Sequence, residues 1–133
     1  MAERIKIALG SVAPLPVPLA FEVSGKDLAT ASPRTIALSD SDIREAFQPI
    51  TEKLVSAIMG ILEVTPPELG ADIMRQGMLL TGGGALLRGF ADRITRATRI
   101  PVHVDSDPLT TVLRGAGITL DDPEKYRDLL IEC

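Results

Sequence analysis

The stretch MLLTGGGALLR (residues 78–88) decides the fold, because it predicts a strand, a glycine turn and the start of a helix in close succession. Met78–Leu80 is a short apolar run between glycines, which is typical of a buried strand. Thr81–Gly84 supplies the turn, and Ala85–Thr98 continues as a predicted helix. Pro101–Val104 predicts the next strand. This order is a βαβ unit, whose two strands run parallel.

The three glycines of the turn permit backbone conformations that other residues avoid, and they leave no Cβ to obstruct a ligand. A helix start beyond them offers free N–H groups to a phosphate, a ribose or a purine. The spacing matches neither a Walker A loop nor a GxGxxG fingerprint. Two interpretations therefore stay open: contact with a ligand, and a tight turn that lets the helix pack close to the sheet.

The segments before this unit predict a helix followed by a small antiparallel pair of strands. Ala2–Leu9 is a predicted helix that ends at Gly10. Leu19–Val23 and Arg34–Leu38 are predicted strands, and two turn signals, Ser24–Asp27 and Ser32–Pro33, come between them.

The middle of the chain predicts helices. Ser39 is a favourable N-cap, and Pro49 should break or kink the helix that starts there. Ile50–Val64 then has the clearest amphipathic pattern of the chain. The remaining predicted helices are shorter: Pro67–Arg75, Pro108–Gly115, and a helical tail over Asp121–Cys133 that contains Leu129, Leu130 and Ile131.

Composition excludes several classes of function. The 133 residues carry a net charge of −4, which argues against a nucleic-acid surface. A single Cys and a single His exclude a disulfide framework within one chain and disfavour His-based catalytic or metal sites. Lack of disulfides makes a reducing cytoplasm the simplest compartment. The first residues weakly resemble a signal peptide, but Glu3 and the prolines at 14, 16 and 18 argue against one.

A few polar residues allow more than one interpretation. His103 alternates with two valines on a strand and is expected to be a surface or packed histidine and not a ligand. Asp105 and Asp107 could hold a cation, but helix capping by Asp107 is the stronger interpretation. The arginines Arg88, Arg93, Arg96 and Arg99 indicate a solvated helix face, with polymer contact as the alternative.

Several segments resemble the MreB family of bacterial actin-like proteins. They are AERIKIALGS (2–11), SPRTIALSDSDIREAF (32–47), LVSAIMGILEVTPPELGADIMRQGM (54–78), LLTGGGALLRGFADRI (79–94) and IPVHVDSDPLTTVLRGAG (100–117). The resemblance covers about residues 2–120 and weakens from Asp121.

The resemblance implies an α/β fold that forms part of an actin/Hsp70-like ATPase lobe. It would consist of a βαβ cleft subdomain and a small α+β outer subdomain. Residues 1–10 would be a helix end of the cleft subdomain, and residues 11–47 the outer subdomain. Residues 48–120 would be the C-terminal part of the cleft subdomain, followed by a tail at 121–133.

The resemblance also implies a site for the adenosine part of ATP. Glu3 and Lys6 match the family's E-x-x-K helix, which contacts adenine and ribose. Taken alone, this pair would be an ordinary i,i+3 salt bridge. The glycine turn matches the family's adenosine-side loop. The candidate cofactor-binding residues are Glu3, Arg4, Lys6, Gly82, Gly83, Gly84, Ala85 and Leu86, with no catalytic or metal residue among them.

The family's phosphate-gripping hairpins have no counterpart in this sequence. Mg²⁺ would be held mainly by those missing parts, so we expect no ATP hydrolysis by this polypeptide alone. For the full-length family the resemblance implies filament formation, contact with the cell-wall elongation machinery, and a cytoplasmic, membrane-associated location that sets rod shape. Alternatives are a non-catalytic module that binds filaments or cell-wall machinery without nucleotide, and an enzyme or chaperone of the same superfamily. Exposed sheet edges predict self-association or marginal stability.

Overall fold

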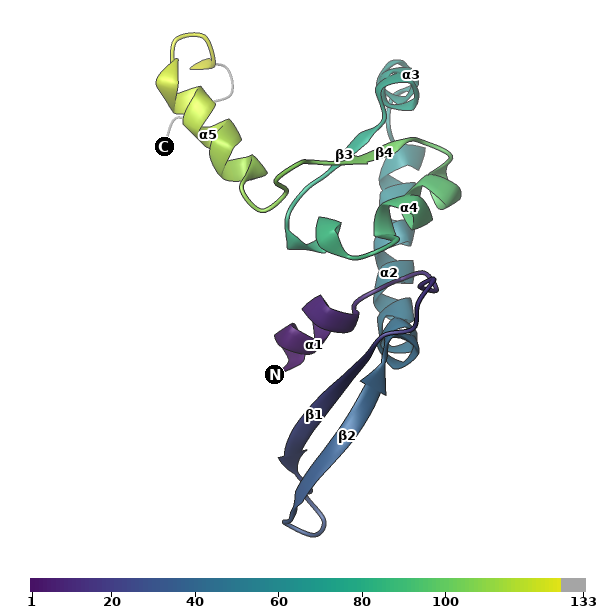
Figure 1. Ribbon diagram of the computed structural model, residues 1–133. Helices are drawn as coiled ribbons and strands as arrows, with labels where there is room; N and C mark the ends of the chain where they lie inside the picture. Colours follow the sequence, from purple (N-terminus) through teal and green to yellow (C-terminus); the bar gives the residue numbers. More distant parts are fainter. Residues whose placement is uncertain (128–133) are drawn as a thin grey trace.

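The computed structural model describes residues 1–127 and contains five α-helices, four strands and one 3₁₀ helix within them (Figure 1). In chain order these are α1 (Ala2–Leu9), β1 (Ala20–Lys26), β2 (Pro33–Ser39), α2 (Asp40–Glu63), α3 (Pro67–Gln76), β3 (Met78–Leu80), the 3₁₀ helix η1 (Gly83–Leu86), α4 (Phe90–Thr98), β4 (Val102–Val104) and α5 (Thr111–Asp121). The fold is therefore mixed α/β, as the sequence predicts.

The predicted βαβ unit is confirmed. Strands β3 and β4 pair in parallel, with Met78 opposite Val102 and Leu80 opposite Val104. Helix α4 connects them and packs against β4. The buried apolar side chains among the described residues gather around this unit and the end of α1: Leu9, Ala85, Phe90, Ile94 and Ile100.

The predicted helix over Ala85–Thr98 is wrong in one respect, because the chain forms two helical pieces there. The 3₁₀ helix η1 ends at Leu86, and the backbone of the next residue, Leu87, is extended. Gly89 then adopts a left-handed conformation with φ of 78° and caps α4. A Cβ on Gly89 would lie 2.8 Å from the Cβ of Ala13, so the approach of the Ala13 loop also requires glycine here.

Strands β1 and β2 form the expected antiparallel hairpin, but the predicted turn at Ser24–Asp27 is misplaced. Strand β1 continues to Lys26, which pairs with Pro33. The hydroxyls of Ser24 and Thr35 lie 2.8 Å apart across the pair, so Ser24 belongs to the ladder. The turn covers 27–32 instead, where the Asp27 carboxylate accepts hydrogen bonds from the backbone N–H groups of Ala29 and Thr30.

Helix α2 begins as expected and then continues through Pro49, where a break or a kink was predicted. Ser39 caps it, with a reciprocal bond between the Ser39 backbone and the Asp42 carboxylate. Pro49 lies inside the helix without ending it. The helix contacts α1, β2 and α4, and local propensity alone does not predict these contacts. The expected subdomain boundary between residues 47 and 48 falls inside this helix and stays a prediction.

Helix α5 differs from the predicted helix over Pro108–Gly115, since it starts at Thr111 and ends at Asp121. Asp107 does not cap it, because its carboxylate accepts a bond from the Thr110 hydroxyl instead. After α5, residue 122 forms a bend, residues 123–126 form turns, and Arg127 has 3₁₀ helical conformation. The rest of that predicted tail, with Leu129, Leu130 and Ile131, lies outside the described residues.

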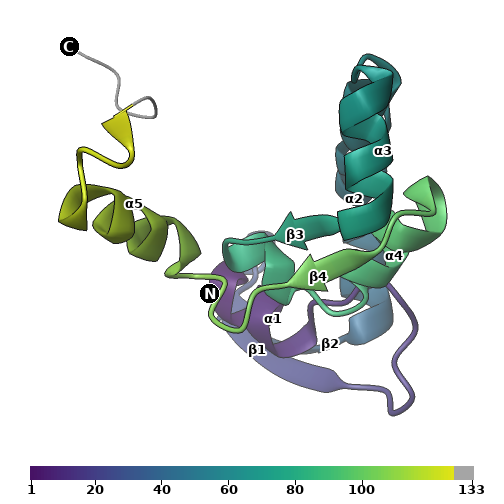
Figure 2. The same cartoon turned by 90° about the horizontal axis from the view of Figure 1, so that it is seen from above.

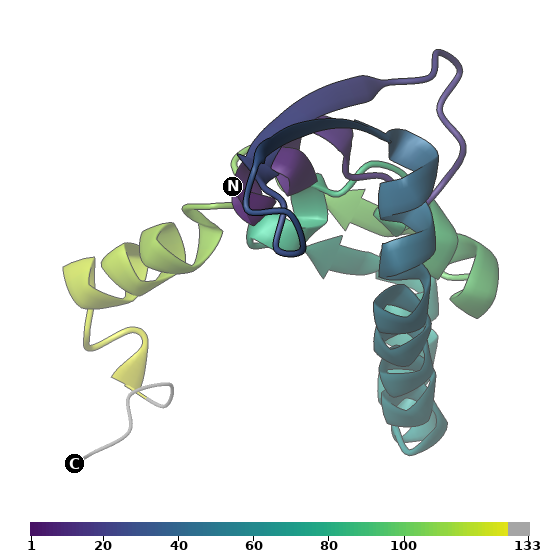
Figure 3. The same cartoon turned by 90° about the horizontal axis from the view of Figure 1, so that it is seen from below.

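The arrangement of the elements is elongated. Figures 2 and 3, with Figure 1, show α2 as a central rod with the β1–β2 hairpin at one end and α3 at the other, while α5 projects as an arm. Many large apolar side chains stay exposed, Leu28, Val64 and Val112 among them. In residues 1–127 no helix combines the length and apolar character needed to cross a membrane.

Candidate functional site

Two of the segments that the sequence singled out meet at one hollow of about 570 Å³. Helix α1 contributes the side chains of Glu3, Lys6 and Ile7 to its lining. The glycine turn contributes Gly83, Gly84 and Leu86. This volume lies within the range of about 300–1,000 Å³ that is typical of small-molecule sites, and the hollow combines apolar walls with a few charged groups.

The charged wall of the hollow is an ion pair on α1. The ammonium of Lys6 lies 2.7 Å from a carboxylate oxygen of Glu3. Both side chains are at least half exposed, so the pair itself adds little to stability. A carboxylate can accept bonds from ribose hydroxyls, and a lysine stem can lie along a purine while its ammonium donates. The Glu3–Lys6 pair is an ordinary i,i+3 salt bridge, and it also lines the hollow with groups that can bond a nucleoside.

The glycine turn forms the opposite wall. Gly82 follows β3 with φ of 77°, a conformation that favours glycine. Its N–H donates to the Pro108 carbonyl at 2.7 Å, which ties the turn to the segment before α5. A Cβ on Gly84 would meet no atom within 4 Å, so this glycine leaves open space beside the hollow. A ligand can therefore approach the backbone of η1 closely.

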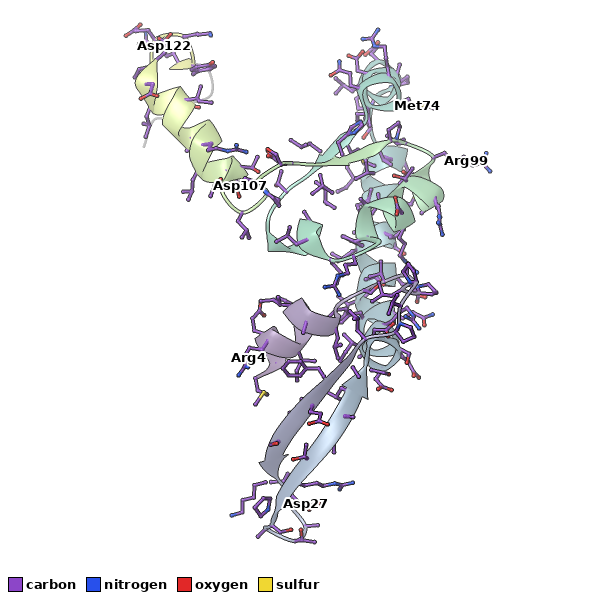
Figure 4. All side chains as sticks on the ribbon, viewed as in Figure 1. Arg4, Asp27, Met74, Arg99, Asp107 and Asp122 are labelled. Atoms are coloured by element: carbon purple, nitrogen blue, oxygen red, sulfur yellow. The ribbon has the colours of Figure 1, made fainter. Side chains whose placement is uncertain are left out.

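The other predicted site residues lie differently. Arg4 points outward from α1 (Figure 4) and is not part of the lining. Gly82 shapes the turn but does not line the hollow. Ala85 is only 6% exposed and packs into the core. Of the eight predicted residues, the structure brings Glu3, Lys6, Gly83, Gly84 and Leu86 to the hollow.

Helix α2 supplies a third wall that the sequence analysis did not assign to the site. Phe47, Ile50 and Leu54 line the hollow from this helix. They recur at i, i+3 and i+7, which is the spacing of one helix face. The spacing was visible in the sequence, but the partner of that face was not. These side chains give the hollow its apolar character.

Helix α1 and the glycine turn are held together by contacts of Arg88. Its guanidinium donates to the Ala8 carbonyl at 3.1 Å. The N–H of Val12 donates to the Arg88 carbonyl at 2.9 Å. Between these two bonds lie Leu9 and Ser11, which are fully buried. The two walls are therefore parts of one packed unit.

The acidic residues considered for a cation are already engaged. Asp105 accepts bonds from the Asp107 N–H at 3.0 Å and from Arg114 at 2.8 Å. These bonds lower the pKa of Asp105 to about 2. Within residues 1–127 no three His, Cys, Asp or Glu side chains gather in a way that suits a metal ion. His103 is exposed on β4.

The arginines of α4 include one with a partner on another helix. Arg93 lies 3.7 Å from the Glu52 carboxylate of α2. Arg96 and Arg99 are exposed. Arg96 and Arg99 agree with the expected solvated face, whereas Arg88 precedes α4 and bonds to Ala8, and Arg93 pairs with Glu52.

Comparison with known proteins places these features in a family. Residues 1–128 match the family described as MreB/Mbl protein. The chain is 48% identical over 120 residues to the cell shape-determining protein MreB of Escherichia coli K12, covering 90% of this chain and 35% of that protein. It is 37% identical over 124 residues to the cell shape-determining protein Mbl of Bacillus subtilis, covering 93% of this chain and 37% of that protein. The chain thus spans about a third of the length of these relatives.

Two solved structures of an MreB protein are similar to this chain in fold. The crystal structure of MreB5 of Spiroplasma citri bound to ADP superposes with a TM-score of 0.88 at 30% identity, covering 96% of this chain and 39% of that one. The same protein bound to AMPPNP gives a TM-score of 0.87 at 30% identity, covering 96% of this chain and 38% of that one. The match in sequence extends through α1, the hairpin, the glycine turn and α5. The chain therefore belongs to the MreB/Mbl family of actin-like, cell shape-determining proteins.

Proposed function

We propose that this chain is a portion of an ATP-binding actin-like protein and that it contributes the adenosine side of the nucleotide cleft. The observation that carries the proposal is the convergence of Glu3, Lys6, Gly83 and Gly84 on one hollow. Two structural neighbours are nucleotide-bound forms of MreB5, which supports the same assignment.

The hollow suits a nucleoside better than a triphosphate. Its apolar wall from Phe47, Ile50 and Leu54 fits the face of a purine, and the Glu3 carboxylate fits ribose hydroxyls. The hollow has only the Lys6 ammonium and the Arg88 guanidinium as cationic groups. The triphosphate and its Mg²⁺ therefore depend mainly on parts of the protein beyond these residues. For the same reason we propose that this chain by itself does not hydrolyse ATP.

Calorimetric titration of the chain with ATP, ADP and adenosine tests this assignment. We expect all three ligands to bind, with dissociation constants within about tenfold of one another, because the contacts proposed here are to the shared adenosine. The absence of heat at millimolar ligand would contradict it and favour a module that acts without nucleotide. Metal-dependent phosphate release by the chain would contradict the second part.

The wider role follows from the family. We propose that the whole protein assembles into filaments that determine cell shape, in the cytoplasm and in association with the membrane and the cell-wall elongation machinery. The relatives are named as cell shape-determining proteins, which supports this role. Loss of rod shape on depletion of the protein, restored by the unaltered gene, is the expected result in a rod-shaped host.

A further inference from the structure

We propose that a second hollow, between α2 and α4, binds a small hydroxyl-bearing anion through the guanidinium groups of Arg44 and Arg93. The hollow has a volume of about 410 Å³, which lies within the usual range of small-molecule sites. Its lining shares only Thr51 with the adenosine hollow. The anion would therefore occupy a site of its own, independent of the proposed nucleotide.

Helix α2 builds most of this second hollow. It contributes residues spaced three or four apart, which share one helix face: Ser41, Arg44, Glu45, Gln48 and Thr51. This face is polar along its length. It differs in character from the apolar wall of Phe47, Ile50 and Leu54 that the same helix gives to the adenosine hollow.

The rest of the lining comes from α4 and from the segment after α1. Arg93 lies on α4, and Val12 lies on that segment. The Val12 N–H donates to the Arg88 carbonyl at 2.9 Å, just before α4 begins. Helix α4 also packs against α2 (Figure 1). These contacts bring Arg44 and Arg93, from two different helices, to one hollow.

Both guanidinium groups keep N–H donors that no protein atom uses. A guanidinium carries five such donors. Within residues 1–127, the Arg44 group makes one hydrogen bond, to the Asp40 carboxylate at 2.9 Å. The Arg93 group makes none there, and the nearest Glu52 oxygen is 3.7 Å away, beyond hydrogen-bond length. The two side chains are only 29% and 35% exposed, so an anion would satisfy donors that are partly withdrawn from water.

The charges around the hollow define the ligand. Its lining has two positive groups against one negative group, Glu45. Asp40 and Glu52 offset the arginines from outside the lining, so hydrogen bonds and not net charge would hold the anion. The planar guanidinium fork matches two oxygens of a carboxylate or a phosphate. The Glu45 carboxylate can accept a bond from a ligand hydroxyl, which favours a sugar phosphate or a hydroxy acid.

Titration of the isotope-labelled chain with glucose 6-phosphate and with malate tests the site, at constant ionic strength because salt screens exposed charges. Glucose, which lacks the anionic group, is the control. At least one of the two anions should shift the backbone amides of Arg44, Gln48 and Arg93 together, with saturation in the millimolar range. The tighter of the two shows whether phosphate or carboxylate is preferred. No saturable shift with either anion, or equal shifts with glucose, would overturn the proposal.

Two arginine variants of α4 separate the hollow from general surface charge. Arg93→Gln should weaken anion binding by roughly tenfold, because charge-assisted bonds are lost. Arg96→Gln makes the same change of charge on the same helix outside the lining and should bind as the unaltered chain does. Arg44→Lys keeps a charge beside Asp40 without the planar fork and should bind several times more weakly. Equal affinity in Arg93→Gln and Arg96→Gln would overturn the proposal.

A titration in saturating adenosine separates this site from the proposed nucleotide site. Since the two linings share only Thr51, the anion should bind with unchanged affinity when adenosine is present. Loss of anion binding in adenosine would overturn the assignment of a separate site. Anion binding that depends on Arg93, in a chain that does not bind adenosine, would overturn the nucleotide assignment alone.

Discussion

The Arg88 guanidinium donates a hydrogen bond to the carbonyl of Ala8 at 3.1 Å and so joins the glycine-turn segment to a helix 80 residues earlier in the chain. The bond lies beside the hollow, whose lining includes Arg88. It links the C-terminal end of α1 to the segment that follows η1. The candidate site therefore depends on this tertiary contact as well as on the residues that would touch a ligand.

Replacement of Arg88 tests that dependence. Arg88→Ala should lower the free energy of unfolding by about 1 kcal/mol, the usual net contribution of one hydrogen bond. Adenosine binding should weaken too, because α1 is no longer tied to the turn. Urea unfolding followed by far-UV circular dichroism gives the first value and calorimetry the second. Arg96→Ala, at an exposed position of α4, should change neither. An Arg88→Ala chain with unchanged stability and unchanged affinity for adenosine would show that the site does not depend on the Arg88–Ala8 contact.

Two glycines of the turn should respond differently to alanine. Gly82→Ala places a Cβ at φ of 77° and should cost about 1–2 kcal/mol, although no atom lies within 4 Å of that Cβ. Gly84→Ala has open space and no such backbone requirement, so the urea midpoint should stay nearly unchanged. Equal losses in the two variants would contradict the assignment of the cost to the positive φ of Gly82.

Helix α2 should become more stable when Pro49 is replaced. Pro49 cannot donate to the helix backbone and crowds the preceding turn, which costs roughly 3 kcal/mol in a helix interior. Pro49→Ala is therefore expected to raise the free energy of unfolding by about 1–3 kcal/mol, measured as the urea midpoint. Pro67→Ala serves as the control, because Pro67 occupies the first turn of α3, where proline is tolerated. An unchanged midpoint for Pro49→Ala would mean that the helix already relieves this cost.

Stability should depend on pH through Asp105. Its pKa is lowered to about 2, first by the bond from the Asp107 N–H and then by Arg114. A carboxyl with a lower pKa in the folded state stabilises the fold above its unfolded pKa of about 4, and this contribution is lost as pH falls from about 4 toward 2. Asp105→Asn should therefore be less stable than the unaltered chain at neutral pH, with the difference shrinking below about pH 4.

Urea unfolding at several pH values checks this expectation. Asp92→Asn removes an exposed carboxylate of α4 and controls for the change in net charge. A difference between Asp105→Asn and the unaltered chain that persists at the lowest pH would contradict the assigned role of this carboxylate.

The sequence predicted features that depend on neighbouring residues. Ser39 caps α2, and Gly77 and Gly82 bound the strand Met78–Leu80. Family resemblance added the pairing of Glu3 and Lys6 with the glycine turn, which periodicity alone does not predict. Five of the eight expected site residues line one hollow.

The features that the sequence analysis predicted wrongly or missed depend on contacts between segments that are distant in the chain. The division of the predicted helix at Gly89 follows from its contact with the Ala13 loop. The continuous α2 through Pro49 follows from packing against other elements. The apolar wall from Phe47 and Ile50 becomes part of the site only because α1 and η1 lie against that face of α2. A linear pattern predicts that such a face will be covered, but it does not identify the covering element.

The most direct test of the central claim is a map of backbone amide shifts during titration of the isotope-labelled chain with adenosine. If the hollow is the adenosine side of a nucleotide cleft, the amides of 3–7 on α1 and 83–86 on η1 should shift together and saturate with one dissociation constant. The amides of the hairpin turn, 27–32, should stay unchanged. Shifts confined to one of the two walls, or centred elsewhere in the molecule, would contradict the claim.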